Sequence, residues 1–94
     1  MEKIEIATPE PEKARLVIQE AIARHRKLLK QSVIFTQERV QQLVAQLHVD
    51  PEALLAGKVV HAEEQDMDLL ELEGELELLR HLREQVETLD HLAL

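Results

Sequence analysis

The side chains of this chain best suited to acid–base or metal chemistry are one histidine and three carboxylates that fall among apolar residues. At about 100° per residue, His25 lies in the middle of the apolar arc of the first expected helix, and Asp68, Glu71 and Glu75 lie among the leucines of the last one. A carboxylate turned toward an apolar interior is costly unless it is ion-paired or bound to a metal. We therefore expect His25 to meet one of these acids across a helix interface, as a buried polar layer or, in a symmetric dimer, as a metal site.

The ion-paired layer is the favoured alternative of the two. Helical di-iron sites carry a Glu-x-x-His sequence on one helix, and none of the five histidines has a glutamate three residues before it. The chain has no cysteine, which also excludes disulfides and thiolate zinc sites. We expect no metal and no cofactor. The other histidines should lie at the surface or at helix ends: His48, His61, His81 and His91.

Nucleophilic catalysis has no support in the sequence. Ser32 is the only serine, and the chain has two glycines and no glycine-rich phosphate loop. Because no nucleophile is expected beside an activating base, we expect no catalytic residues and a protein that is not an enzyme.

Two acidic sequences point to a different alternative. The sequence "LEGEL" followed by "ETLD" resembles the paired motifs, Glu-x-x-Glu and Glu-x-x-Asp, of the all-α MazG-type nucleotide pyrophosphohydrolases, and Glu87 and Asp90 fit the second motif. The first motif is not met, because Leu72 lies three residues before Glu75. In that family the motifs sit on separate antiparallel helices, whereas here they fall on one expected helix. The resemblance implies metal-dependent nucleotide hydrolysis, which we keep as a minor alternative.

The elements that position these residues are all expected to be helices. Residues 1–9 form an extended or flexible N-terminal segment, and residues 10–94 form a single helical domain. Apolar residues at helical spacing predict a long helix over residues 10–31 and a shorter one over residues 36–48.

Local signals predict where these helices begin and end. The sequence "SVIF" is β-branched and aromatic, and Thr36 after it offers an N-cap, with Phe35 placed to pack onto the helix that follows. Asp50 and Pro51 repeat the start signal, and Gly57 gives a stop signal. A short helical turn is therefore predicted between Asp50 and Gly57.

The last helix is expected to run from about residue 62 to the C-terminus, which is about 45 Å for about 30 residues. Leucine and glutamate alternate around Gly74 in "DLLELEGELELL", which is a strand period, but neither residue favours strands. One internal glycine costs a helix only about 1 kcal/mol, so a helix is predicted. Apolar residues then step by three and four and form a predicted interaction seam: Leu69, Leu72, Leu76, Leu79, Leu82, Val86 and Leu89.

The expected fold is all-α, with a long basic helix, a shorter helix plus a short helical turn, and a long acidic C-terminal helix. That last helix is longer than the other expected helices can cover, so its seam favours a second chain. We therefore predict a helical-bundle homodimer.

Charge is unevenly distributed along the chain, whose net charge is −8. Residues 1–45 hold eight Lys/Arg and six Asp/Glu, a balance of +2, whereas residues 46–94 hold three and thirteen, a balance of −10. Two oppositely charged halves that fold onto each other, or onto a second copy, explain this best. The cations of the first helix form an expected basic face: Lys13, Arg15, Arg24, Arg26, Lys27 and Lys30.

A DNA-binding alternative rests on "FTQERVQQLVAQLHVDPEALLAG", which loosely resembles helix-turn-helix proteins. The second helix of that motif should carry the base-reading side chains, but here it offers Glu52 and nothing basic before Lys58. A regulator or antitoxin-like protein that uses the basic face therefore stays a second alternative, and nucleic acid is not the expected partner.

The function most consistent with these patterns is that of a small adaptor or scaffold acting through helix–helix contacts with proteins. No segment is apolar over the length that spans a bilayer, and the first residues lack the apolar core of a signal peptide. We therefore expect a cytoplasmic protein without membrane contact, whose partners are a second copy of the chain and another protein.

Overall fold

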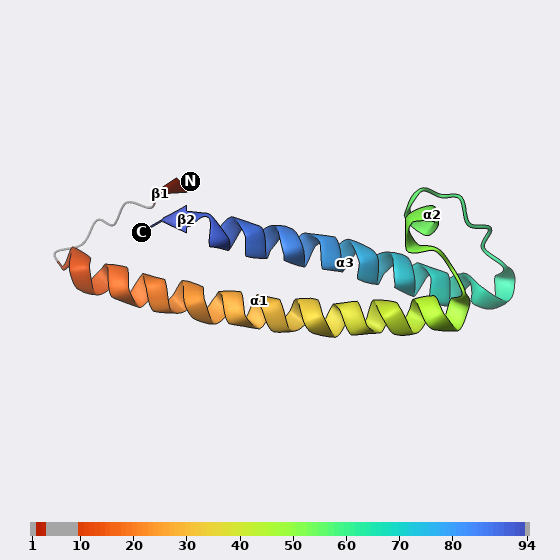
Figure 1. The fold of residues 1–94 in the computed structure, drawn as a ribbon, viewed down its shortest axis with the longest axis horizontal. Coiled ribbons are helices and arrows are strands. Elements are labelled where there is room, and N and C mark those ends of the chain that lie inside the picture. The colour runs from red at the N-terminus through yellow and green to blue at the C-terminus, as the bar shows by residue number, and fades with distance from the viewer. Residues whose placement is uncertain (1, 4–9, 94) are drawn as a thin grey trace.

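The protein is a helical hairpin in a computed structural model that describes residues 2–3 and 10–93. The two long helices, α1 and α3, run antiparallel and side by side, and α2 lies at the end where the chain turns back (Figure 1). The fold is all-α, as predicted, apart from one two-residue strand pairing. The elements in chain order are β1 (Glu2–Lys3), α1 (Pro11–Leu47), α2 (Pro51–Leu55), the 3₁₀ turn η1 (Glu63–Gln65), α3 (Asp66–Asp90) and β2 (Leu92–Ala93).

Helix α1 is one unbroken helix of 37 residues, so the predicted break before Thr36 is wrong. Thr36 lies in mid-helix and is 4% exposed instead of capping a second helix, and Phe35 is 75% exposed instead of packing inward. The β-branched residues of "SVIF" each cost a helix less than about 1 kcal/mol. An unbroken α1 buries Val40, Leu43 and Leu47 in the core, which is worth about 1.5–3 kcal/mol for each side chain.

The turn after α1 contains the residues whose types predicted it. His48 ends α1 in the left-handed region with φ 53°. Asp50 caps α2 by accepting a hydrogen bond from the backbone N–H of Glu52 at 3.2 Å, and Pro51 is the first residue of that helix. Gly57 follows with φ 72°, a conformation that glycine adopts without steric cost. The predicted short helical turn between Asp50 and Gly57 is confirmed.

The palindromic segment around Gly74 is helical, as predicted, and forms the first half of α3. Helix α3 has 25 residues, fewer than the expected length, because its first turn is preceded by the 3₁₀ turn η1 and it ends at Asp90. A carboxylate at the start of a helix is favourable, since the helix dipole leaves positive charge there, and Asp66 and Asp68 occupy the first turn.

The predicted seam of α3 is covered by α1 of the same chain, so the expectation that it needs a second chain is wrong. With the predicted break, the first helix was too short to cover the seam of α3. The unbroken α1 has 37 residues and α3 has 25, so α1 is long enough to cover it. Four seam residues are buried and three are half-buried: Leu69, Leu72, Leu79 and Leu82, then Leu76, Val86 and Leu89.

The tightest packing lies at the α2 end of the hairpin, where all three helices meet. Leu43 of α1, Leu54 of α2, and Leu69 and Leu72 of α3 are each 0–2% exposed. Beyond this end the described part of the chain is two helices thick, and the molecule measures 61 × 20 × 16 Å. Its radius of gyration is 18.8 Å, whereas a compact domain of this length has about 12 Å. The sides of the two-helix region are therefore left open.

At the other end α1 extends past α3. Arg26 of α1 is level with Asp90, the last residue of α3, because the two form an ion pair at 3.3 Å. The 15 residues of α1 before Arg26, about four turns, therefore lie beyond α3. Near the ends of the chain, β1 and β2 pair in parallel, with Glu2 opposite Leu92. Of the segment 1–9 only β1 falls within the described residues.

Candidate interaction surface

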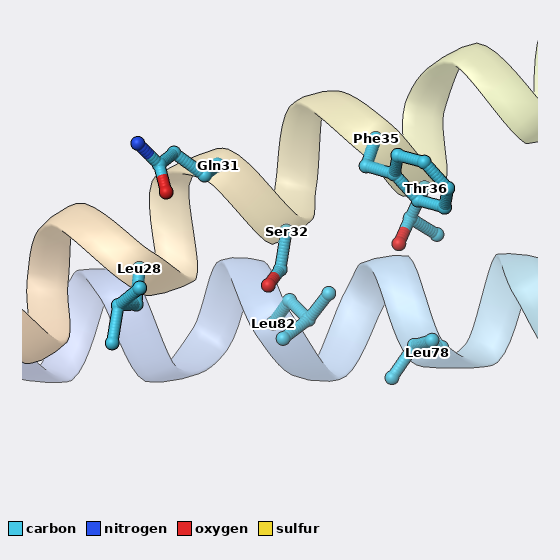
Figure 2. Close-up of a pocket in the computed structure, with 7 residues that line it drawn as sticks. All are labelled: Leu28, Gln31, Ser32, Phe35, Thr36, Leu78 and Leu82. Atoms are coloured by element: carbon cyan, nitrogen blue, oxygen red, sulfur yellow. The ribbon is translucent and has the colours of Figure 1, made fainter.

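A groove of about 450 Å³ crosses the middle of the hairpin between α1 and α3. Figure 2 shows it from the side, with Ser32 of α1 pointing toward Leu82 of α3 and Thr36 placed above Leu78. We call this surface the central groove. Seven residues line it: Leu28, Gln31, Ser32, Phe35 and Thr36 of α1, and Leu78 and Leu82 of α3.

Three large apolar side chains of the central groove face solvent. Leu28 is 61% exposed, Phe35 75% and Leu78 45%. On α1, Leu28, Ser32 and Phe35 recur at positions i, i+4 and i+7, so they form a stripe on one side of the helix. This stripe runs beside the row of residues that α1 buries against α3. The hairpin covers the buried row and leaves the stripe open.

The lining of the central groove contains no charged residue, although 32% of the chain is charged. Protein interfaces have the same character, because charged residues are depleted at their centre while aromatic residues are enriched. The opposite face of the hairpin differs. Its groove of about 320 Å³ includes the cations Lys30 and Arg83 beside Val33, Ile34 and Val86.

Toward the α2 end, the α1 stripe and the side of α3 next to it carry charged residues. Arg39 continues the α1 stripe at i+11 from Leu28 and pairs with Glu71 of α3, its Nε lying 3.0 Å from Glu71 Oε1. Glu75, four residues after Glu71, lies on the same side of α3 and is half-buried. Among residues 2–3 and 10–93, no ion pair joins Glu75 to another side chain.

The predicted polar layer does not form within one chain. His25 is exposed and neighbours Arg26, at the level of the end of α3. Glu71 pairs instead with Arg39, which is about 21 Å farther along α1 than His25 at 1.5 Å per residue. Asp68 and Glu75 are half-buried near the α2 half of the hairpin. A helical wheel gives the direction of a side chain around the helix axis, but not its position along the axis. His25 and the three acids lie at different positions along the hairpin, so they do not meet.

The predicted basic face is not a continuous stripe. At 100° per residue its six cations spread over about half of the circumference of α1. Three of them sit beside acids: Lys13 and Glu10 at 3.5 Å, Arg24 and Glu20 at 4.0 Å, and Arg26 and Asp90 at 3.3 Å. The others are exposed: Arg15, Lys27 and Lys30.

The acids that resemble the hydrolase motifs do not come together. Glu87 and Asp90 lie 12 and 15 residues after Glu75 on the same helix, which is about 18 and 22 Å. Asp90 also pairs with Arg26. Within the described part of the chain, no three His, Asp or Glu side chains form a group that could hold a metal ion.

One cluster was missed from the sequence. His61, in the connection between α2 and α3, lies between two acids, with Nδ1 2.9 Å from Asp66 Oδ1 and Nε2 3.3 Å from Glu73 Oε1. Each ring nitrogen therefore faces one carboxylate oxygen. The cluster holds the connection against the start of α3. His61, Asp66 and Glu73 are not regularly spaced in the sequence, so no sequence pattern predicted this cluster.

The remaining histidines lie where the sequence placed them. His48 ends α1 and His91 follows α3, with its Nδ1 2.9 Å from the backbone oxygen of Glu87. His81 is exposed on α3.

The outer face of α3 is held by pairs along the helix. Arg80 donates to Glu77 at 2.8 Å and to Glu84 at 3.5 Å. The hydrogen bond and negative charge of Glu77, together with the charge of Glu84, raise the pKa of the Arg80 guanidinium above its ordinary value. Arg80 therefore holds its positive charge between the two acids.

None of the helices in the described segments combines the length and apolar character needed to cross a bilayer. No protein-family model, curated protein or solved structure matches the chain. The surfaces of the hairpin are therefore the basis on which function is inferred.

Proposed function

We propose that the protein is a small adaptor or scaffold that binds protein chains through helix–helix contacts and performs no catalysis itself. The observation that carries this proposal is the central groove, an uncharged and exposed apolar surface on a chain rich in charge. Contiguous apolar surface of this kind marks sites of protein interaction.

The shape of the groove suits a helical partner. It lies between two antiparallel helices, and an amphipathic helix can place a row of apolar side chains into such a depression. Leu28 and Phe35 are one heptad apart, which is the repeat that a packed helix matches. Covering Leu28, Phe35 and Leu78 removes three large apolar side chains from water, at about 25 cal/mol for each Å² buried.

The proposed assembly is a helical-bundle homodimer that also offers surface to another protein. The two-helix thickness of the hairpin supports it, because four helices around a shared core are a stable arrangement whereas two leave their sides exposed. The proposed location is the cytoplasm, in keeping with the absence of cysteine from the sequence.

Photo-crosslinking at the groove tests the proposal. A benzophenone amino acid replaces Phe35 in one variant and Leu16 in a control, since Leu16 is similarly exposed at 61% but lines neither groove. The expected result is protein adducts from position 35, formed in purified protein or in extract of the source cells, and few from position 16. Equal yields at the two positions in both preparations would refute the proposal.

A further inference from the structure

We propose that the occupant of the central groove is the same groove of a second copy, related by a two-fold axis that runs along the hairpin. In this dimer α1 of each copy lies on α3 of the other. The inference rests on the proposed function, and it names the first partner and its orientation.

The exposed area supports a second copy. The accessible surface of the chain is 7179 Å², whereas a compact monomer of 10.8 kDa exposes about 5,500 Å². The surplus is about twice the 800 Å² that each partner buries in a stable interface of standard size. An interface of that size on one face of the hairpin would therefore account for about half of the surplus.

Two stripes with identical spacing make the face self-complementary. Positions 28, 32, 35 and 39 on α1 and positions 71, 75, 78 and 82 on α3 each follow the pattern i, i+4, i+7 and i+11. Their apolar members are in the middle of the hairpin, and Arg39, Glu71 and Glu75 are toward the α2 end. The face is therefore apolar at one level and charged at another.

A two-fold axis along the hairpin matches these levels. Both copies then place their α2 ends together, and each α1 lies antiparallel to α3 of the second copy. Phe35, which is level with Leu78 in its own chain, meets Leu78 of the second copy. Arg39 comes to the level of Glu71 and Glu75 of the second copy, so opposite charges meet.

A two-fold axis across the hairpin gives the opposite result. It places α1 on α1 and α3 on α3, with the α2 ends apart. With Leu28 set against Phe35 of the other copy, Arg39 lies at the level of Arg24. Helix α1 holds seven Lys/Arg and three Glu, a net charge of +4, and α3 holds two Arg and nine Asp/Glu, a net charge of −7. Like-charged helices would therefore be stacked, which disfavours this dimer.

The half-buried Glu75 supports the first arrangement independently. No ion pair joins it to another side chain of the described chain, so its carboxylate is free to pair with a cation of a second copy. Arg39 of the second copy would stand beside it, so that Arg39, Glu71 and Glu75 of both copies form one alternating network. The opposite groove offers no such match, because a second copy placed there in the same way would set Lys30 against Arg83 of the other copy, which are like charges.

The absence of cysteine allows a direct test with single spin labels at introduced cysteines. Light scattering at a protein concentration of about 50 µM should give twice the mass of one chain. This concentration is well above a dimer Kd of about 1 µM, so a dimer of that affinity would be mostly assembled. A label at Lys58→Cys, near the α2 end, should then give an inter-copy distance within about 30 Å, a few helix spacings. The crossed arrangement, centred midway between Leu28 and Phe35, predicts a distance of about 45 Å, because Leu47 at the α2 end lies about 23 Å from that centre in each copy.

Matched variants identify the surface. Phe35→Glu should give a monomer with unchanged helical content, because Phe35 is mostly exposed within one chain, whereas Leu16→Glu should stay dimeric. Glu75→Lys should raise the dimer Kd about tenfold or more, and Glu84→Lys, the same change on the outer face of α3, should change it little.

The outcomes separate this inference from the proposed function. A monomeric mass at 50 µM overturns the inference, while crosslinking of position 35 to another protein would still support the adaptor function. A dimer with a long Lys58→Cys distance, or one that survives Phe35→Glu, also overturns it.

Discussion

Arg39 of α1 and Glu71 of α3 join the two long helices across 32 positions of sequence, with Arg39 Nε 3.0 Å from Glu71 Oε1. The pair lies toward the α2 end of the groove whose lining includes Phe35 and Leu78. The side chains of Arg39 and Glu71 are 40% and 41% exposed, so water screens their attraction.

We expect the Arg39–Glu71 pair to contribute modestly to stability. Arg39→Gln and Glu71→Gln should each lower the free energy of unfolding, with a coupling energy of at most about 1 kcal/mol in a double-mutant cycle. Urea unfolding at one fixed protein concentration measures it, since association shifts apparent stability. The cycle for Arg24 and Glu20, which are 4.0 Å apart and more exposed, is the control and should show weaker coupling. Equal coupling in the two cycles would contradict the prediction.

Leu72 should be among the residues most sensitive to truncation. It is 0% exposed in the part of the core where three helices meet, so Leu72→Ala should lower the free energy of unfolding by about 2–5 kcal/mol. Leu70→Ala is the matched control, because Leu70 is on the same helix and is 50% exposed. A comparable loss for both variants in thermal unfolding would show that the core is misplaced.

The two glycines should respond to alanine with opposite signs. Gly74 lies inside α3, and an added Cβ would meet nothing within 4 Å, so Gly74→Ala should raise the free energy of unfolding by about 0.5–1 kcal/mol. Gly57 has φ 72°, where a side chain costs about 1–2 kcal/mol, so Gly57→Ala should lower it. Urea unfolding of each variant, compared with the unchanged protein, measures the two shifts in midpoint. A shift of both midpoints in the same direction would contradict the prediction.

His61 should hold the connection between α2 and α3 closed. Removing its contacts with Asp66 and Glu73 in His61→Ala should speed tryptic cleavage after Lys58 by about fivefold, which corresponds to about 1 kcal/mol of local opening. Mass spectrometry of the first fragments gives the rate. His81→Ala, an exposed histidine on α3, provides the reference, and cleavage after Lys58 at the same rate in both variants would rule out the proposed restraint.

Local signals in the sequence predicted the parts of the fold that depend on neighbouring residues. Asp50, Pro51 and Gly57 determine the short helix between α1 and α3 because capping and left-handed backbone are decided within a few positions. Gly74 was correctly placed inside a helix, because the propensity of leucine and glutamate outweighed their strand-like alternation.

Features that depend on tertiary packing were not predicted. Thr36 carries a valid N-cap signal, yet α1 continues through it because residues after it pack on α3. The predicted break then left the α3 seam without a cover in its own chain, whereas the unbroken α1 buries most of it. His25 and its three acids were assigned to one layer because helical wheels give direction around a helix and not the level along it. The central groove was missed, since Leu28, Phe35 and Leu78 lie beside the main apolar rows.

The unequal lengths of the two long helices have a consequence for backbone motion. About four turns at the start of α1, around Leu16, have no second long helix to lie against, and an isolated helical stretch of that length is only marginally stable in water. Those turns persist because the rest of α1 serves as their nucleus, so their amides should take up deuterium in a gradient that slows toward Arg26. The hairpin would thus fray from the N-terminal end of α1, while the amides at the end closed by α2 exchange most slowly.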